Sequence, residues 1–147
     1  MTVSDDQLRD ILVTSRHIAV VGLSPNPARP SHRVAAYLQD VGYRIIPVRP
    51  AVRSVLGQPA FPDLRSAART APIDIVDVFR RSEVIPELVD DCLAVRPRLV
   101  FLQVGVVHPG AAARLEAAGI PVVMDECLKV EHARLVGRAA VRPTGGP

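Results

Sequence analysis

Aromatic side chains are scarce in this sequence: they make up 3% of the 147 residues, and tryptophan is absent. A core built by this chain must therefore be filled by valine, leucine, isoleucine and alanine. Such a composition is typical of parallel strands covered by helices on both faces. The scarcity of aromatic rings also argues against a nucleic-acid-binding surface in which basic residues alternate with stacking rings.

Cysteine is scarce as well, since only Cys92 and Cys127 are present and they show no CxxC spacing. No secretory leader accompanies them, so we expect reduced thiols in a cytoplasmic protein. The sequence also lacks an apolar run long enough to span a bilayer. These absences argue against a disulfide scaffold and predict a protein without a membrane segment.

Charge of one sign does not dominate, because 18 basic residues stand against 15 acidic ones and the formal net charge is +3. The basic residues are mostly arginines, and they are spread along the chain rather than gathered in one run. Arginine is the preferred protein partner of phosphate, because its planar guanidinium donates two hydrogen bonds at once. The composition therefore favours a phosphorylated small molecule over a nucleic acid as the ligand.

Strand-like and helix-like segments alternate along the chain. Nearly continuous runs rich in Val and Ile predict buried parallel strands at 17–22, 43–48, 73–79, 99–104 and 121–125. Apolar residues at helical spacing predict helices at 4–14, 31–41, 63–71, 82–95, 109–118 and 128–136. The alternation predicts an α/β fold, a single Rossmann-like doubly wound domain over residues 1–140 with a five-stranded, mainly parallel sheet and helices on both faces. Residues 141–147, rich in Pro and Gly, are expected to form a disordered tail.

Capping residues mark the ends of several predicted helices. Ser4 and Gln7 have the spacing of a capping box, and Ser82 is the expected N-cap of the helix at 82–95. Gly42 and Gly119 follow two of the helices, at positions where glycine commonly ends a helix.

Residues 18–24, Ile-Ala-Val-Val-Gly-Leu-Ser, form a predicted buried strand that ends in a glycine turn shortly before a helix. Such a turn exposes backbone N–H groups, and the helix start adds its partial positive charge, so that together they suit a phosphate. We expect Gly22→Val to abolish ligand binding by blocking this approach while the fold persists.

Two further features of this region distinguish among nucleotide ligands. The loop after Gly22 is not GxGxxG, which weakens the case for NAD. Arg49, rather than an acidic residue, follows the second predicted strand. An arginine there favours a phosphorylated ribose, which both NADP and coenzyme A (CoA) carry.

The four histidines suggest no catalytic set. His17 begins a predicted strand and is expected to be structural, and His132 is expected on the surface of the last predicted helix. His32 and His108 are candidates to face a ligand, but nothing pairs them with an acid or a nucleophile.

The acidic residues near the predicted strands suggest no catalyst either. Asp74 and Asp77 flank a buried strand, and we expect both to serve turn and helix contacts. Asp125 and Glu126 are adjacent on a predicted strand and would point to opposite faces. We therefore assign no catalytic residue and no metal ligand.

Several blocks of the sequence resemble the small stand-alone CoA-binding proteins. The blocks are 18–31 (Ile-Ala-Val-Val-Gly-Leu-Ser-Pro-Asn-Pro-Ala-Arg-Pro-Ser), 44–48 (Arg-Ile-Ile-Pro-Val), 56–57 (Leu-Gly), 74–81 (Asp-Ile-Val-Asp-Val-Phe-Arg-Arg), 103–107 (Gln-Val-Gly-Val-Val) and 123–132 (Val-Met-Asp-Glu-Cys-Leu-Lys-Val-Glu-His). They span almost the whole chain in the family's order and spacing. That family is similar in fold to the CoA-binding domain of the succinyl-CoA synthetase α subunit.

The resemblance implies that the chain binds CoA or an acyl-CoA. The pyrophosphate would lie on the loop 22–24 and at the helix start near Ser31, and the adenosine 3′-phosphate toward Arg49 and Arg53. No residue here matches the synthetase's phosphohistidine, so the resemblance does not imply ligase activity.

The same resemblance places the adenine near Phe79 and Arg80. Together with the residues that follow the predicted strands, it predicts a CoA site formed by Gly22, Leu23, Ser24, Arg29, Ser31, Val48, Arg49, Arg53, Phe79, Arg80, Gln103 and Gly105.

Two other functions stay open at this point. One is an NADP-dependent oxidoreductase, in which His108 or Asp125 would have to supply the proton donor. The other is an interaction subunit that docks on an acyl-CoA enzyme and keeps the fold without a ligand.

Overall fold

The computed structural model describes residues 3–137, which contain a five-stranded sheet, a short hairpin and six α-helices. The sheet order is β2-β1-β5-β6-β7, and its strands are β1 (His17–Val21), β2 (Arg44–Val48), β5 (Ile75–Val78), β6 (Leu99–Leu102) and β7 (Val122–Val123). Every neighbouring pair in this sheet is parallel. The predicted single α/β domain with a doubly wound parallel sheet is therefore confirmed. The predicted tail, 141–147, lies outside the described residues.

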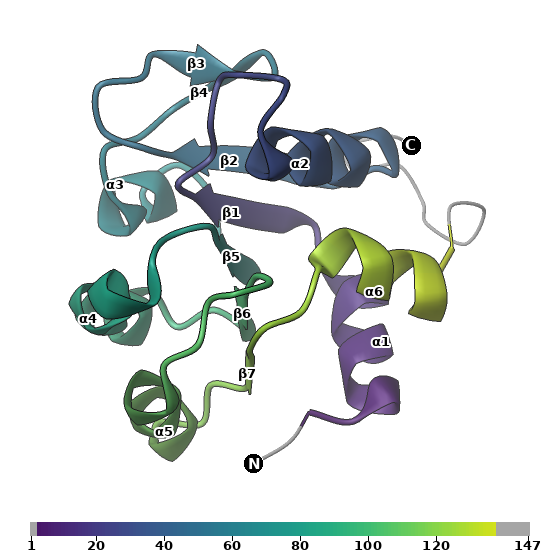
Figure 1. Ribbon diagram of the computed structural model, residues 1–147, viewed down its shortest axis with the longest axis vertical. Helices are drawn as coiled ribbons and strands as arrows, with labels where there is room; N and C mark the ends of the chain where they lie inside the picture. The colour runs from purple at the N-terminus through teal and green to yellow at the C-terminus, as the bar shows by residue number, and fades with distance from the viewer. Residues whose placement is uncertain (1–2, 138–147) are drawn as a thin grey trace.

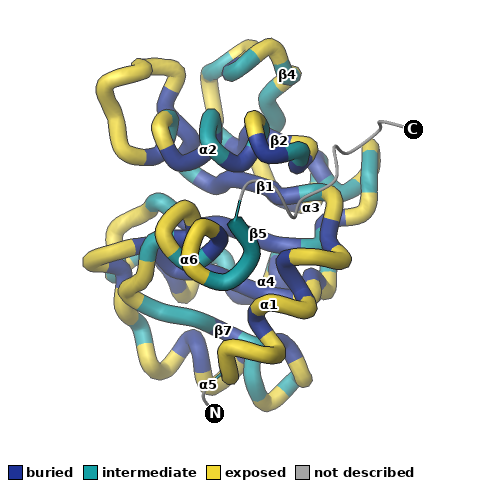
Figure 2. The backbone as a smooth tube through the Cα atoms, turned by 90° about the vertical axis from the view of Figure 1, so that its right-hand side faces the viewer, coloured by how far each residue is buried: buried dark blue, intermediate teal, exposed yellow. Residues whose placement is uncertain are grey.

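The helices cover the sheet in two layers (Figure 1). One face carries α3 (Leu64–Ala68), α4 (Ile85–Val95) and α5 (Pro109–Ala117), and the other carries α1 (Asp5–Thr14), α2 (Pro30–Asp40) and α6 (Leu128–Leu135). Alternate side chains of each strand supply the two cores. The strands are buried between the layers, and the exposed stretches lie in loops and on outer helix faces (Figure 2). Within residues 3–137, no helix is both long enough and apolar enough to cross a membrane.

Strand β1 lies at the point where the direction of winding reverses. The chain leaves β1 for β2 on one side and later returns to β5 on the other side. In open α/β sheets the connections diverge at such a point and leave a crevice beyond the carboxyl ends of the strands.

Most of the predicted capping signals are confirmed. Ser4 Oγ accepts a hydrogen bond of 3.1 Å from the backbone N–H of Gln7 at the start of α1. Gly42 and Gly119 adopt φ angles of 114° and 85° just after α2 and α5. This left-handed conformation ends a helix at little cost only when the residue is glycine.

The expectation for Ser82 was wrong. Residues Ser82–Val84 form a 3₁₀ turn, η1, and α4 begins only at Ile85. The Ser82 hydroxyl instead accepts a hydrogen bond of 2.9 Å from Val107 N and donates one of 3.3 Å to Gly105 O. Ser82 therefore joins the segment after β5 to the loop after β6 instead of capping a helix.

A hairpin that the sequence patterns do not predict lies between β2 and α3. Its strands, β3 (Ser54–Val55) and β4 (Gln58–Pro59), are too short to show any periodicity, and Leu56 and Gly57 between them both have positive φ. Beyond β4, Phe61 forms a parallel bridge with Val48 at the end of β2. The hairpin thus borders the carboxyl end of β2.

Candidate functional site

A groove of about 1100 Å³ lies at the carboxyl ends of the strands, where the winding reverses. Its lining comes from the β1–α2 loop, the first turns of α2, the residues that follow β2, β5 and β6, and Cys127 at the start of α6. The volume is slightly above the range of about 300–1,000 Å³ that is typical of small-molecule sites. The crevice that the topology leaves open is therefore large enough for a nucleotide.

The fold itself requires glycine at position 22, independently of any ligand. It adopts φ 85°, and its N–H donates to the carbonyl oxygen of Val48 at 2.8 Å. A Cβ at this position would collide with the carbonyl oxygen of Phe79. The expectation that Gly22→Val spares the fold was therefore wrong, because the side chain would meet backbone rather than empty space.

Hydrogen bonds brace the loop between Gly22 and α2. Ser24 N donates to Ser31 Oγ at 3.0 Å, and Asn26 N donates to Ser24 Oγ at 3.1 Å. Arg29 is the N-cap residue of α2 but makes no side-chain cap, and Pro30 follows it. Pro30 has no N–H, and the N–H groups of His32 and Arg33 donate to Arg29 O. The backbone N–H of Ser31 and the partial positive charge of the helix start are therefore what this turn offers to an anion.

Arginines surround the same edge of the sheet. Arg29, Arg49 and Arg81 line the groove. An adjoining pocket shares Gly22, Arg49, Phe79 and Arg81 with the groove and adds Val48, Pro50 and Arg80. Across residues 3–137, none of these four arginines forms an ion pair. Several arginines without a carboxylate partner in the described chain therefore line the groove and the pocket beside it.

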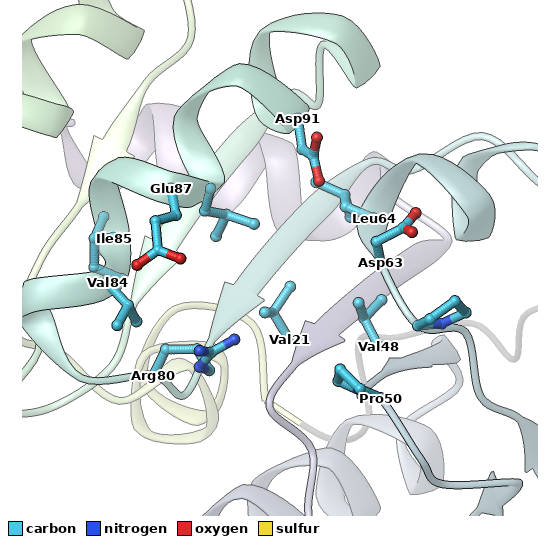
Figure 3. A pocket seen from close by; sticks show the side chains of 12 residues that line it. Val21, Val48, Pro50, Asp63, Leu64, Arg80, Val84, Ile85, Glu87 and Asp91 are labelled. Atoms are coloured by element: carbon cyan, nitrogen blue, oxygen red, sulfur yellow. The ribbon is translucent and has the colours of Figure 1, made fainter.

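A smaller pocket of about 150 Å³ adjoins this edge on the side of α3 and α4 (Figure 3). Its floor is apolar and includes Val21, Val48 and Leu64, while Arg80 extends toward Val21 across the opening. Carboxylates, including that of Glu87, lie around it. The pocket suits a small flat group with polar edges more than a phosphate.

Asp77 occupies a position that the sequence reading misjudged. It serves no turn or helix contact, because it is fully buried inside β5, where its Oδ1 accepts a hydrogen bond from Nε2 of Gln103. Burial raises the pKa of Asp77 to about 7, although the hydrogen bond from Gln103 opposes the rise. Gln103, in turn, lines the groove.

His132 is also placed differently from the expectation. It is completely buried rather than on the surface of α6, and its Nδ1 lies 2.9 Å from the hydroxyl of Tyr37. Burial lowers the pKa of His132. The apolar spacing of α6 did not reveal this burial, because a histidine scores as polar in such a pattern.

The two candidate proton donors of the oxidoreductase hypothesis make loop contacts. His108 caps α5, with Nδ1 accepting from Ala111 N at 3.0 Å. Asp125 lies beyond the short β7 rather than within a strand, has φ 58°, and accepts a hydrogen bond of 2.7 Å from Gly105 N. Both side chains hold the loops that follow β6 and β7.

The predicted site residues divide into three groups. Seven line the groove: Gly22, Ser24, Arg29, Ser31, Arg49, Phe79 and Gln103. Two line the adjoining pocket but not the groove: Val48 and Arg80. Three are in neither lining: Leu23 is completely buried, Arg53 is exposed just before β3, and Gly105 belongs to the loop contact with Asp125.

The groove also contains residues that the predicted set omits. Val34, Val104, Val106 and Cys127 give it an apolar part. Val34 was read only as part of the buried stripe of a helix, and nothing in the pattern shows that the first turns of that helix border a cavity. Cys127 follows a predicted strand, so its position was a usable signal.

Comparisons with known proteins show what the chain is similar to. A protein-family model described as a CoA binding domain matches residues 16–133. The chain is 43% identical over 130 residues to the uncharacterized protein YneT of Bacillus subtilis (strain 168). The aligned segment covers 88% of this chain and 95% of that protein.

Two solved structures have the same fold at similar length. The Thermus thermophilus protein cell-free ID.343 is 42% identical with a TM-score of 0.86, over 90% of this chain and 98% of that one. A hypothetical protein from Pyrococcus horikoshii OT3 is 31% identical with a TM-score of 0.86, over 91% of this chain and 93% of that one.

Proposed function

The chain belongs to the family of CoA-binding domains, and we propose that it binds coenzyme A or an acyl-CoA in the groove at the carboxyl edge of the sheet. The observation that supports this most is the set of arginines without ion pairs around the uncapped start of α2. CoA carries a pyrophosphate and a 3′-phosphate at one end, and these charges need several cations at once.

The pyrophosphate fits the loop after Gly22 and the first turn of α2. The backbone N–H of Ser31, the partial positive charge of the helix start and the guanidinium of Arg29 would act together on it. Ser24 and Ser31 hold each other and fix the shape of this cradle.

The adenosine end fits the adjoining pocket. Arg49 lies in both cavities and would bind the 3′-phosphate, with Arg80 beside it and Arg53 farther out. Phe79, which is partly exposed and lines the adjoining pocket, offers a ring face for the adenine. This arrangement leaves the rest of the groove for the pantetheine arm.

The proposal is one of binding, with no catalytic step. The groove gathers arginines, serines, two side-chain amides and apolar side chains. His108 and Asp125, the two candidate proton donors, accept hydrogen bonds from backbone N–H groups.

Thermal unfolding in the presence of nucleotides tests the proposal. A ligand that binds only the folded state stabilises it by about 2.7 kcal/mol at 100 times its Kd. We expect CoA to raise the Tm in a concentration-dependent way and dephospho-CoA, which lacks the 3′-phosphate, to raise it less. If CoA leaves the Tm unchanged while NADP raises it, the proposal is wrong.

A further inference from the structure

We propose that Asp77 is a positioning residue that holds the side-chain amide of Gln103 in place to bind an amide of the pantetheine arm. The inference rests on the proposed function and deepens it. In this proposal Gln103, which lines the groove, contacts the arm, and Asp77, which is buried in the core, holds Gln103.

The register of the sheet places Asp77 directly beneath the groove. Asp77 pairs with Val20 of β1 and Phe101 of β6, and both of these side chains belong to the core under α1, α2 and α6. Gln103 follows Phe101 by two residues, so it continues on the same face one step nearer the carboxyl edge. Gln103 lines the groove, whereas Asp77 is fully buried and does not.

The pair is difficult to explain by stability alone. Asp77 Oδ1 accepts from Gln103 Nε2, but Oδ2 has no hydrogen-bond partner within the described part of the chain. A buried oxygen without a partner costs free energy that an apolar side chain of similar size would not. Asp77 is thus costly for stability, and its hydrogen-bond partner Gln103 lines the groove. This combination suggests that Asp77 serves the groove rather than the core.

The hydrogen bond determines what Gln103 offers to a ligand. Because its nitrogen is directed to Asp77, its amide oxygen is the end available to accept a hydrogen bond in the groove. A fixed acceptor loses little rotamer freedom when it binds. The pantetheine arm of CoA carries two amide N–H groups that match such an acceptor.

The surroundings of Gln103 suit the arm rather than the phosphates. The arginines and serines of the groove come from the β1–α2 loop, α2 and the residues after β2 and β5, whereas Gln103, Val104, Val106 and Cys127 follow β6 and β7. This part therefore offers apolar surface and one amide, as a chain of methylenes and amides requires.

Calorimetry with two ligands tests the assignment. CoA has the arm, and adenosine 3′,5′-bisphosphate keeps the phosphorylated ribose but lacks the arm. We expect Gln103→Met and Asp77→Leu each to raise the Kd for CoA about tenfold, while the Kd for the bisphosphate changes less than about twofold. Asp77→Asn keeps an acceptor oxygen and should recover most of the lost affinity.

The double variant separates positioning from general damage. Because Asp77 acts through Gln103, Asp77→Leu/Gln103→Met should bind CoA no more weakly than Gln103→Met alone. Gln39→Met is the matched control, since the Gln39 amide donates to Leu56 O and lies outside the groove.

Two results would overturn the inference and leave the proposed function standing. One is an equal loss for both ligands in Gln103→Met, and the other is additive losses in the double variant. If the wild-type protein binds neither ligand, the proposed function itself is wrong and this inference with it.

Discussion

Asp74 and Asp77 are three residues apart, yet their carboxyl groups lie near opposite ends of β5 and meet opposite surroundings. At the amino end, Asp74 Oδ2 accepts hydrogen bonds from Arg16 N at 2.8 Å and His17 N at 2.9 Å. Toward the carboxyl end, Asp77 is buried with one hydrogen bond and one oxygen that has no described partner. The fold gives one carboxylate two backbone hydrogen bonds and leaves the other with a single hydrogen bond beneath the groove.

The arginines show the same contrast. On the outer helix surfaces, Arg65 and Arg114 form ion pairs with Asp91 and Asp90. At the carboxyl edge, Arg49 and Arg80 form none within residues 3–137. The arginines on the outer helices are thus paired by the fold, whereas those at the carboxyl edge keep the charge that the proposed ligand would neutralise.

The largest expected effect concerns the pH dependence of stability. Burial raises the pKa of Asp77 to about 7, from about 3.9 in an unfolded chain. The stability that it contributes is therefore full below pH 4 and is lost as the pH rises through 7. The free energy of unfolding of the wild type, relative to Asp77→Asn, should fall by about 1.4 kcal/mol per pH unit in this window.

Urea unfolding of both proteins between pH 4 and pH 8 measures this difference. His132 has the opposite sign, because burial lowers its pKa and its contribution is lost as the pH falls below 6.5. Both proteins contain His132, so its effect cancels in the difference. Parallel pH profiles for the two proteins would show that Asp77 is not held in the protonated form.

The next effect concerns ligand affinity at the arginine edge. Hydrogen bonds to charged groups contribute about 1.5–3 kcal/mol each. We expect Arg49→Gln/Arg80→Gln to weaken CoA binding by roughly a hundredfold or more, measured by calorimetry. The control is Arg114→Gln/Arg134→Gln, since Arg114 pairs with Asp90 and Arg134 pairs with Asp5 and Glu131, and neither arginine lines the groove. It makes the same change in net charge and should leave the affinity nearly unchanged. Equal losses in both variants would indicate long-range charge rather than contact.

Sequence reasoning succeeded for the fold because the core elements carry strong periodic patterns. All five strands of the sheet lie within the predicted runs, and Ser4, Gly42 and Gly119 act at helix ends as expected. It failed for the hairpin β3–β4, since two-residue strands carry no pattern. It also failed for Ser82, whose hydroxyl joins loops that only the tertiary fold brings together.

The site was predictable only where position along a strand determines location. Residues that directly follow strands, such as Arg49, Phe79 and Gln103, were found in this way, and they line the groove. Val34 was missed because its exposure to a cavity depends on how α2 approaches the sheet. Asp77 was misread because a lone polar residue in an apolar run looks the same whether it ends a strand or is buried within one.

The smallest expected effect tests whether the arginines at the carboxyl edge of the sheet stabilise the fold. Arg65 and Asp91 are joined at 2.7 Å with side chains that are 55% and 28% exposed, and such a pair contributes about 0.5 kcal/mol. Arg65→Gln should lower the free energy of unfolding by about this amount, and the loss should vanish in the background Asp91→Asn. Among residues 3–137, the Arg49 side chain makes one long hydrogen bond, of 3.4 Å to Gly22 O, so Arg49→Gln should leave the urea midpoint unchanged or slightly raised. If instead Arg49→Gln is the more destabilising of the two, the arginines of the carboxyl edge serve the fold, and the contrast between the two regions fails.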